Sequence, residues 1–430
     1  MVNNMKPGFF TIISAQFFSS LADNALLIAA IAVLIEIAAP EWMRPLLKLF
    51  FTISYVLLAP FVGPFSDSMP KGRVMFLTNN IKIVGCLLFF FNIHPLAAYA
   101  IVGFGAASYA PAKYGILTEL LPPEKLVLAN GWLESTTVVS ILLGTLLGGL
   151  LITDTVSSKI LSLNLIKFLN ISTPAESSIF IISMIYFFAA ILNLFIPKTG
   201  AEYKRSSLNP FLLIKKFINC NIILWKDKVG QISLSVTTLF WGAGATLQFI
   251  VLQWAEINLN MDLDQAAMLQ GIVSVGIIIG SFLAAKYVSL FNALKVLPLG
   301  VFLGLVIPLM TMSFDLGSAT FLLILIGALG GFFVVPMNAL LQHRGYVTLS
   351  AGQSIAVQNF NENLNVLFML GLYSLLLFFR VNISTIVFGF GAFLGLTMLI
   401  VIIKYQRNKL KYDLNKLIGD KRSALLQDKC

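Results

Sequence analysis

Long apolar runs are the feature of this sequence that most constrains its fold. Twelve such runs follow one another with short polar breaks, close to or above the length of about 20 residues that an α-helix needs to cross a bilayer. They lie at residues 9–36, 46–66, 74–92, 95–118, 127–152, 177–197, 229–256, 265–288, 294–313, 316–341, 350–379 and 382–404. The apolar residues in each run are continuous, whereas the strands of a membrane barrel alternate between apolar and polar residues, so a barrel is excluded. We therefore predict an all-α membrane protein with 12 transmembrane helices.

The composition excludes a soluble surface. Of the 430 residues, 58% are hydrophobic and only 11% are charged, whereas a soluble domain has roughly 25% charged residues. The net charge of +10 would suggest nucleic acid as the partner of a soluble protein. Here, however, most of the Lys and Arg fall on one side of the membrane if both termini are cytoplasmic. We predict a multi-pass protein with both termini in the cytoplasm and no nucleic-acid partner.

The chain divides into two halves of six runs, because one long, Lys-rich connection follows the sixth run. The predicted domains are an N-terminal six-helix bundle at 1–197, a cytoplasmic linker at 198–228, a C-terminal six-helix bundle at 229–405 and a basic cytoplasmic tail at 406–430. Two pairs of sites recur at nearly the same offset between the halves, as expected for an internal duplication. The matched sites are Gly105 with Pro111 against Gly330 with Pro336, and Asn130 with Glu134 against Gln358 with Glu362.

Paired halves of six helices resemble the layout of the major facilitator superfamily. The loop after the second run also resembles that superfamily's cytoplasmic signature, with Gly63, Asp67, Gly72 and Arg73 at the matching places. Two additional residues separate Asp67 from Gly72, and the second half has Ala284 where an Asp is expected. The resemblance implies a conformational gate, in which Asp67 caps a helix of the other half and holds the cytoplasmic side closed. A plain turn residue is the alternative interpretation.

Ionisable residues inside the apolar runs need an explanation, because each costs about 2.5 to 3.5 kcal/mol at the centre of a bilayer. Five stand out: Asp23, Lys82, Lys113, Glu134 and Glu362. In the superfamily that the chain resembles, the central cavity is lined by the spans that hold all of these except Lys82. For Lys82, in the third run, structural pairing or snorkelling is favoured over substrate contact. For the others, the alternative is an ion pair or hydrogen bond between helices.

Amide side chains accompany these charges. They are Asn24 beside Asp23, Gln248 in the seventh run, and Gln358 and Asn359 one helical turn before Glu362. A cavity that holds carboxylates and lysines suits a zwitterionic cargo, because phosphate seeks Lys and ammonium seeks Asp or Glu. We predict substrate contacts for nine residues: Asp23, Asn24, Lys82, Lys113, Glu134, Gln248, Gln358, Asn359 and Glu362. We expect no catalytic residue, metal or cofactor.

Six short segments resemble the bacterial lysophospholipid transporter family. They are residues 22–27, 59–63, 110–117, 240–244, 330–336 and 356–359, in both halves. The resemblance implies a flippase-like transporter that moves lysophosphatidylethanolamine and related lysolipids from the outer to the inner leaflet of the bacterial inner membrane by alternating access. It places all nine candidates except Lys82 and Gln248 at family motif positions. Where this chain has Gln248 we expect Arg, so a phosphate-binding role would pass to Lys113 or Lys82.

The same resemblance implies partners. A separate acyltransferase/acyl-ACP synthetase acts downstream and restores the missing acyl chain, membrane lipids surround the protein, and we expect a monomer. A proton-coupled drug or metabolite exporter of the superfamily is the alternative, with Asp23 as the proton carrier. An intramembrane lipid-modifying enzyme is disfavoured, because it needs a general base near the membrane and the sequence places both His94 and His343 in loops.

Overall fold

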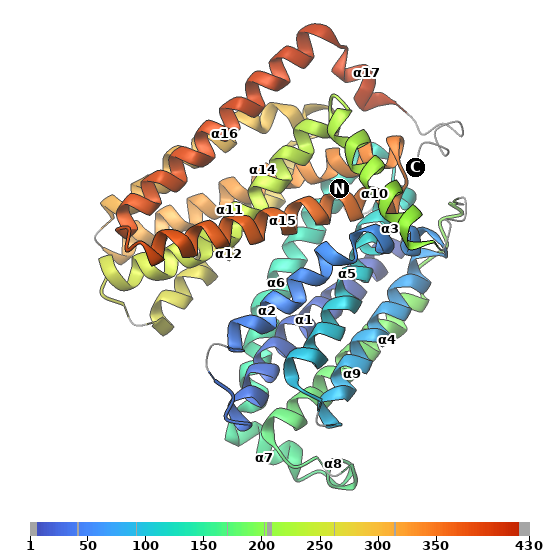
Figure 1. Ribbon diagram of the computed structural model, residues 1–430, viewed down its shortest axis with the longest axis vertical. Coiled ribbons are helices and arrows are strands. Elements are labelled where there is room, and N and C mark those ends of the chain that lie inside the picture. Colours follow the sequence, from blue (N-terminus) through green and yellow to red (C-terminus); the bar gives the residue numbers. More distant parts are fainter. Residues whose placement is uncertain are drawn as a thin grey trace. The chain divides into compact units, whose positions relative to one another are not determined.

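The computed structural model describes residues 7–40, 43–91, 93–169, 171–201, 203, 209–261, 263–313 and 315–420. Within these ranges the regular structure is helical (Figure 1), which confirms the predicted fold class. The longer helices are α1 (Pro7–Glu36), α2 (Met43–Leu57), α3 (Ala59–Asp67), α4 (Lys71–Phe90), α5 (Pro95–Leu120), α6 (Leu126–Ile152), α9 (Pro174–Leu194), α11 (Gly230–Asn258), α12 (Leu263–Tyr287), α13 (Leu297–Val306), α14 (Leu316–Thr348), α15 (Ala351–Phe378) and α16 (Ile383–Lys411). The connecting elements are η2 (Pro123–Lys125), α7 (Asp154–Leu161), α8 (Asn164–Phe168), α10 (Pro210–Lys226), η3 (Leu290–Val296), η4 (Ile307–Met312) and α17 (Leu414–Gly419).

Most of the predicted spans are found as membrane-length helices. Among the described residues, ten helices are long and apolar enough to cross a membrane, or up to eleven if one bent pair counts as a single span. That pair joins α2 to α3 at an angle of 65°, where Pro60 has no amide hydrogen to continue the helix.

The fourth predicted run, 95–118, is not among these spans, although it is a continuous helix, α5. Small and polar residues such as Gly103, Ser108 and Lys113 interrupt its apolar sequence. Most of α5 is buried by protein, so small side chains serve close helix packing there rather than contact with lipid.

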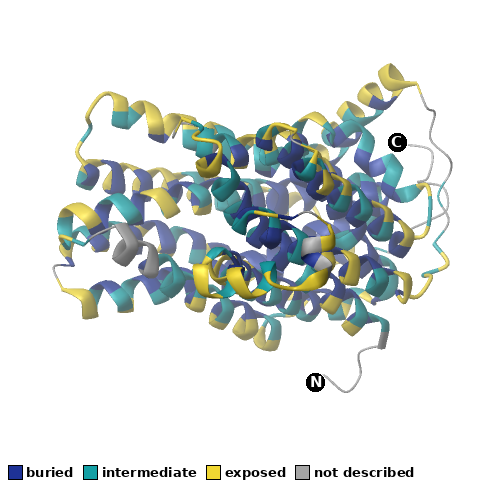
Figure 2. Cartoon of the chain, turned by 90° about the horizontal axis from the view of Figure 1, so that it is seen from below, coloured by how far each residue is buried: buried dark blue, intermediate teal, exposed yellow. Residues whose placement is uncertain are grey.

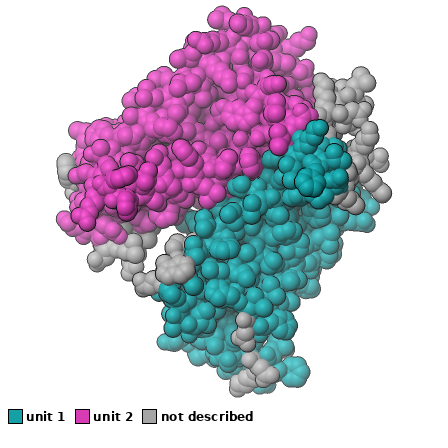
Figure 3. Space-filling view, viewed as in Figure 1, with its two compact units in different colours: residues 1–120, 139–217, 351–356 teal, residues 121–138, 218–350, 357–430 magenta. Residues whose placement is uncertain are grey.

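The helices form two compact units, coloured separately in Figure 3. Unit 1 comprises residues 1–120, 139–217 and 351–356, and unit 2 comprises residues 121–138, 218–350 and 357–430. Two helices are therefore divided: the first half of α6 groups with unit 2, and the first residues of α15 group with unit 1. These are the fifth helices of the two sequence halves. The predicted domain boundaries, which keep each helix whole, stay a prediction.

Unit 1 has its apolar core among α1, α4, α5 and α9, with Leu26 and Tyr186 fully buried. The helices approach closely at small residues. A Cβ atom on Gly85 of α4 would lie 2.5 Å from a methyl group of Val102 on α5, so these two helices are in direct backbone contact. Figure 2 shows buried residues along one side of most helices and exposed residues along another.

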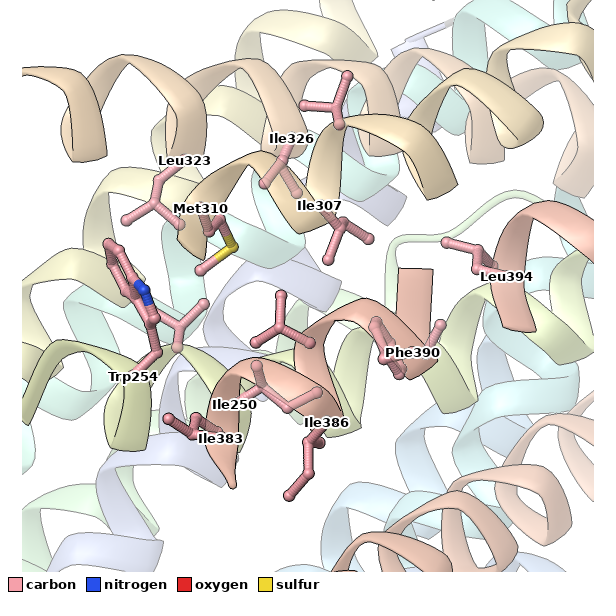
Figure 4. Close-up of a cluster of buried hydrophobic side chains, with 14 of the residues drawn as sticks. Ile250, Trp254, Ile307, Met310, Leu323, Ile326, Ile383, Ile386, Phe390 and Leu394 are labelled. Atoms are coloured by element: carbon pink, nitrogen blue, oxygen red, sulfur yellow. The ribbon is translucent and has the colours of Figure 1, made fainter. Parts of the chain in front are cut away.

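Unit 2 has a second apolar core, shown in Figure 4. The labelled side chains come from α11, η4, α14 and α16: Ile250, Trp254, Ile307, Met310, Leu323, Ile326, Ile383, Ile386, Phe390 and Leu394. Large apolar side chains on the outer surface, such as Phe378 with 79% of its surface exposed, would be unfavourable in water. They are suited to contact with lipid, as expected for a membrane-spanning helix.

Candidate functional site

A buried ion pair joins α1 to α4 in unit 1. The ammonium group of Lys82 lies 2.8 Å from Oδ1 and 2.9 Å from Oδ2 of Asp23. The Lys82 side chain is 1% exposed, whereas that of Asp23 is 20% exposed. The pairing partner that was expected for Lys82 is thus Asp23 itself, and a molecule approaching from outside the unit meets the carboxylate first.

Further polar groups complete this pair. The hydroxyl of Tyr186 on α9 donates a 2.7 Å hydrogen bond to Oδ1 of Asp23. Lys82 also donates to Oγ of Ser19 at 3.0 Å, and Ser19 in turn donates to Oδ1 of Asn79 at 2.8 Å. Removing one member of a buried ion pair leaves an uncompensated charge and typically costs about 3 to 5 kcal/mol. The two charges therefore depend on each other for their place in an apolar bundle.

Asn24 lies next to this pair, at the contact between α1 and α6. Its amide donates to the Ser20 carbonyl oxygen at 2.8 Å. A Cβ atom on Gly144 of α6 would lie 2.4 Å from the carbonyl oxygen of Leu21 and 3.0 Å from Cβ of Asn24. A glycine is thus required for α6 to approach α1 at the level of Asn24.

A second polar group lies in unit 2 and links α6, α14 and α15. Nδ2 of Asn338 donates to Oε1 of Glu134 at 3.2 Å. Nε2 of Gln358 donates both to Oδ1 of Asn338 at 3.1 Å and to Oε1 of Glu362 at 2.8 Å. The predicted residues Glu134, Gln358 and Glu362 therefore come together through Asn338, and each of the four is at most 7% exposed.

One turn away, an amide pair extends this contact. Asn130 of α6 and Gln342 of α14 exchange two hydrogen bonds, each of 2.9 Å. Neither Asn338 nor Gln342 was among the predicted site residues. The signal that could have found them is their spacing of four residues on one long apolar helix, which places two buried amides on the same face.

Three other predicted substrate residues have different neighbours. The Lys113 ammonium lies 4.3 Å from the ring centre of Tyr114. Gln248 is exposed on α11 and donates to Oε1 of Gln270 at 2.8 Å. Asn359 is buried on α15, where its carbonyl oxygen accepts from Asn363.

Overall, the nine candidates are divided between the units. Asp23, Asn24, Lys82 and Lys113 belong to unit 1, and Glu134, Gln248, Gln358, Asn359 and Glu362 belong to unit 2. Among the described residues, the candidates thus form two polar groups, one built on the Asp23–Lys82 ion pair and one on carboxylates joined by amides.

The predicted gate residue Asp67 lies at the end of α3 and contacts the start of α15. Its Oδ1 accepts a hydrogen bond of 2.9 Å from the backbone amide of Gly352, the second residue of α15. A carboxylate in this place is favourable, because it pairs an otherwise unbonded amide at a positive helix end. A Cβ atom on Gly63 would lie 3.0 Å from Cα of Gln353, so the backbones meet there. That this contact holds the cytoplasmic side closed stays a prediction.

Two charged neighbours of Asp67 were missed by the sequence analysis. Lys71 lies 2.5 Å from Asp67 and 3.6 Å from Glu119 of α5, in an almost fully buried cluster. Lys71 is also the first residue of α4. Gly72 is in close contact, because a Cβ atom there would lie 2.8 Å from the carbonyl oxygen of Asn193. The fourth gate candidate, Arg73, is exposed.

The placement of His343 in a loop was wrong. The helix α14 continues past the predicted end of the apolar run at 341 and reaches Thr348, because backbone hydrogen bonding does not stop where hydropathy falls. His343 is 4% exposed, and its Nε2 lies 2.8 Å from the carbonyl oxygen of Ile418 in α17. His94 does lie in the connection between α4 and α5.

The sequence matches known proteins over most of its length. The family model of the Major Facilitator Superfamily matches residues 12–364. The "Lysophospholipid transporter LplT" of Yersinia enterocolitica is 40% identical over 371 residues, which cover 86% of this chain and 87% of that protein. The protein of the same name from Yersinia pestis (strain Pestoides F) is 41% identical over 365 residues, 85% of each chain.

Solved structures share the fold at low sequence identity. The E. coli fucose:proton symporter is 13% identical with a TM-score of 0.69, and the match covers 93% of this chain and 98% of the symporter. A bacterial homologue of the iron transporter ferroportin, in an outward-facing state, is 14% identical with a TM-score of 0.68 and coverage of 94% and 100%. Fold and sequence agree: this chain is a multi-pass membrane transporter that belongs to the lysophospholipid transporter family of the major facilitator superfamily.

Proposed function

We propose that this chain moves lysophospholipids, lysophosphatidylethanolamine among them, from the outer to the inner leaflet of a bacterial inner membrane by alternating access. The observation that carries the proposal is the ion pair of Asp23 with Lys82, whose opposite charges are held inside an apolar helix bundle. Such a pair is costly in lipid. Its opposite charges match those of a head group with an ammonium and a phosphate.

The chemistry of the head group supports this use. The ammonium of lysophosphatidylethanolamine pairs with a carboxylate, and the partly exposed Asp23 offers one. Its phosphate is attracted by positive charge, which in unit 1 comes from Lys113 or, from behind Asp23, from Lys82. The single acyl chain is apolar and fits the apolar helix surfaces or the surrounding lipid. The relatives named as lysophospholipid transporters support the same cargo.

The remaining candidates take roles in the transport cycle. Asn24, Glu134, Gln358, Asn359 and Glu362 line the polar part of the path, and Gln248 affects head-group preference. Gly63, Asp67, Gly72 and Arg73 form the cytoplasmic gate, in which the hydrogen bond from Gly352 to Asp67 breaks when that side opens.

The setting of this activity is also part of the proposal. Both termini lie in the cytoplasm, the protein works as a monomer, and a separate acyltransferase/acyl-ACP synthetase re-acylates the delivered lysolipid. The chain itself performs transport and no chemical step, in keeping with its transporter relatives.

Uptake of labelled lysophosphatidylethanolamine by spheroplasts that express the chain tests this function. We expect uptake by the parent, and a loss of about tenfold or more in Asp23→Ala and Glu362→Gln, since a change of 1.4 kcal/mol corresponds to a factor of ten. Equal uptake by cells without the chain would overturn the cargo. Loss of uptake when the proton gradient is abolished would instead favour the proton-coupled alternative.

A further inference from the structure

Two buried lysines lie on the same face of α4, and their carboxylate partners differ in how far they are exposed. Lys71 and Lys82 are eleven residues apart, which is about three helical turns. Lys71 pairs with Asp67, whose side chain is 8% exposed. Lys82 pairs with Asp23, whose side chain is 20% exposed. Only the second pair therefore offers a carboxylate that a ligand in contact with unit 1 can reach.

The ammonium of Lys82 is fully enclosed. It bonds both oxygens of Asp23 and the hydroxyl of Ser19. The rings of Tyr109 and Tyr186 lie 5.0 Å and 5.4 Å from it, at a distance where an aromatic face attracts a cation. Lys82 thus contributes its positive charge from behind Asp23, while Oδ2 of Asp23 accepts a hydrogen bond from Lys82 alone among the described residues.

The negative charge of Asp23 and the positive charge of Lys82 therefore sum to zero, and the site is neutral because Lys82 is present. In a medium of low dielectric constant, an added or removed unit charge acts strongly on any charged group nearby. A site discriminates between ligands by the difference in their binding energies, and repulsion of a ligand of the wrong charge contributes to that difference. Head groups that differ only in net charge are therefore distinguished by the sum of charges at the site.

We propose that Lys82 is a specificity-determining residue that sets which head-group charge the Asp23 site accepts. The inference rests on the proposed function, since it assumes that Asp23 meets the lysolipid head group. Without Lys82 the site carries a net negative charge and disfavours anionic head groups. Without Asp23 it carries a net positive charge and favours them.

The test compares two lysolipids in proteoliposomes that contain the full chain. Lysophosphatidylethanolamine is zwitterionic and lysophosphatidylglycerol is anionic, and the measured quantity is the ratio of anionic to zwitterionic uptake. We expect Lys82→Met to lower this ratio about tenfold and Asp23→Asn to raise it about tenfold, the factor given by 1.4 kcal/mol. Lys82→Arg keeps the charge and the ratio of the parent. The double variant, with both charges removed, returns toward the parent ratio.

Lys71→Met is the matched control. It removes a buried, ion-paired lysine from the same face of the same helix, so it lowers uptake of both lipids by the same factor and leaves the ratio unchanged. A purely structural role for Lys82 predicts the same behaviour for Lys82→Met. An unchanged ratio in a folded Lys82→Met protein would therefore overturn the proposal.

A second readout covers variants that fold poorly or do not transport. The shift in Tm that each lysolipid produces in purified protein gives the same preference without transport. If Lys82→Met does not fold, Asp23→Asn decides: a Tm shift that fails to move toward the anionic lipid contradicts the proposal. If the parent takes up neither lipid, the proposed function fails, whereas uptake with ratios that do not change between variants removes only the role of Lys82.

Discussion

Buried carboxylates are stabilised in different ways in the two polar groups, that of Asp23 with Lys82 and that of Glu134 with Glu362. In unit 1 a carboxylate is balanced by a lysine, because Asp23 and Lys82 form a direct ion pair. In unit 2 the carboxylates of Glu134 and Glu362 are joined through the neutral amides of Asn338 and Gln358. Replacing one member of an ion pair changes the net charge of the site. Replacing a neighbour of an amide does not, because an amide is neutral and can both donate and accept hydrogen bonds. We therefore expect substitutions in the Asp23–Lys82 pair to have larger and more charge-specific effects than substitutions in the group of Glu134 and Glu362.

The largest effect is expected from breaking the ion pair. Lys82→Met leaves the Asp23 carboxylate without its partner and lowers the free energy of unfolding by about 3 to 5 kcal/mol, as for other buried pairs. The double variant Lys82→Met/Asp23→Asn recovers most of this loss, since no charge then stays unpaired. Thermal unfolding in detergent of the parent, Lys82→Met, Asp23→Asn and the double variant gives the coupling between the two residues. A coupling near zero would show that the pair does not stabilise the fold.

The corresponding change in unit 2 is expected to cost less. Asn338→Leu removes one donor to Glu134 and one acceptor for Gln358, and unsatisfied buried polar groups of this kind cost about 1 to 3 kcal/mol. The free energy of unfolding of Asn338→Leu should lie between that of the parent and that of Lys82→Met. Asn80→Leu is the control, because its amide donates to Phe76 in its own helix. A loss as large as that of Lys82→Met would contradict the distinction between the two polar groups.

The class of the fold could be predicted from the sequence, and so could the charged residues inside it. The apolar runs predicted the helical fold and its membrane class, because a continuous apolar stretch of that length has few alternatives in lipid. Asp23, Lys82, Glu134 and Glu362 were recognised singly, since the cost of a charge in lipid marks each one.

The hydrogen-bond and ion-pair partners of these residues could not be predicted from the sequence. That Asp23 bonds Lys82 depends on how α1, α4 and α9 pack, and glycine contacts such as that of Gly85 with Val102 decide this packing. Asn338 and Gln342 were missed because an uncharged amide in an apolar run costs little and gives a weak signal. The position of Lys71 was overlooked because the cytoplasmic signature was compared by spacing, while the helix start at Lys71 sets the geometry.

A smaller effect is expected at the amide pair of Asn130 with Gln342. Each single change to Leu leaves the other amide unsatisfied and costs about 1 to 2 kcal/mol, whereas replacement of both is close to neutral. Thermal unfolding of the two single variants and the double variant measures this. If the double variant loses the sum of the two single losses, the reciprocal hydrogen bonds do not couple the residues.

The smallest effect is expected at Gln248, which is exposed and bonds Gln270. Gln248→Ala should change the free energy of unfolding by less than about 0.5 kcal/mol, as for most surface substitutions. Uptake of lysophosphatidylethanolamine by Gln248→Ala and Gln248→Arg sharpens the comparison at the residue that departs from the family pattern. A loss in the Ala variant comparable to that of Asp23→Ala would place Gln248 among the residues that contact the head group.

The most direct measurement is leaflet transfer by the purified chain alone. Proteoliposomes receive labelled lysophosphatidylethanolamine in the outer leaflet, and albumin then extracts whatever stays accessible from outside. The account predicts a protected fraction that grows faster with the parent chain than in protein-free vesicles, and growth near the protein-free rate with Asp23→Ala. Protection at the protein-free rate with the folded parent chain would contradict it.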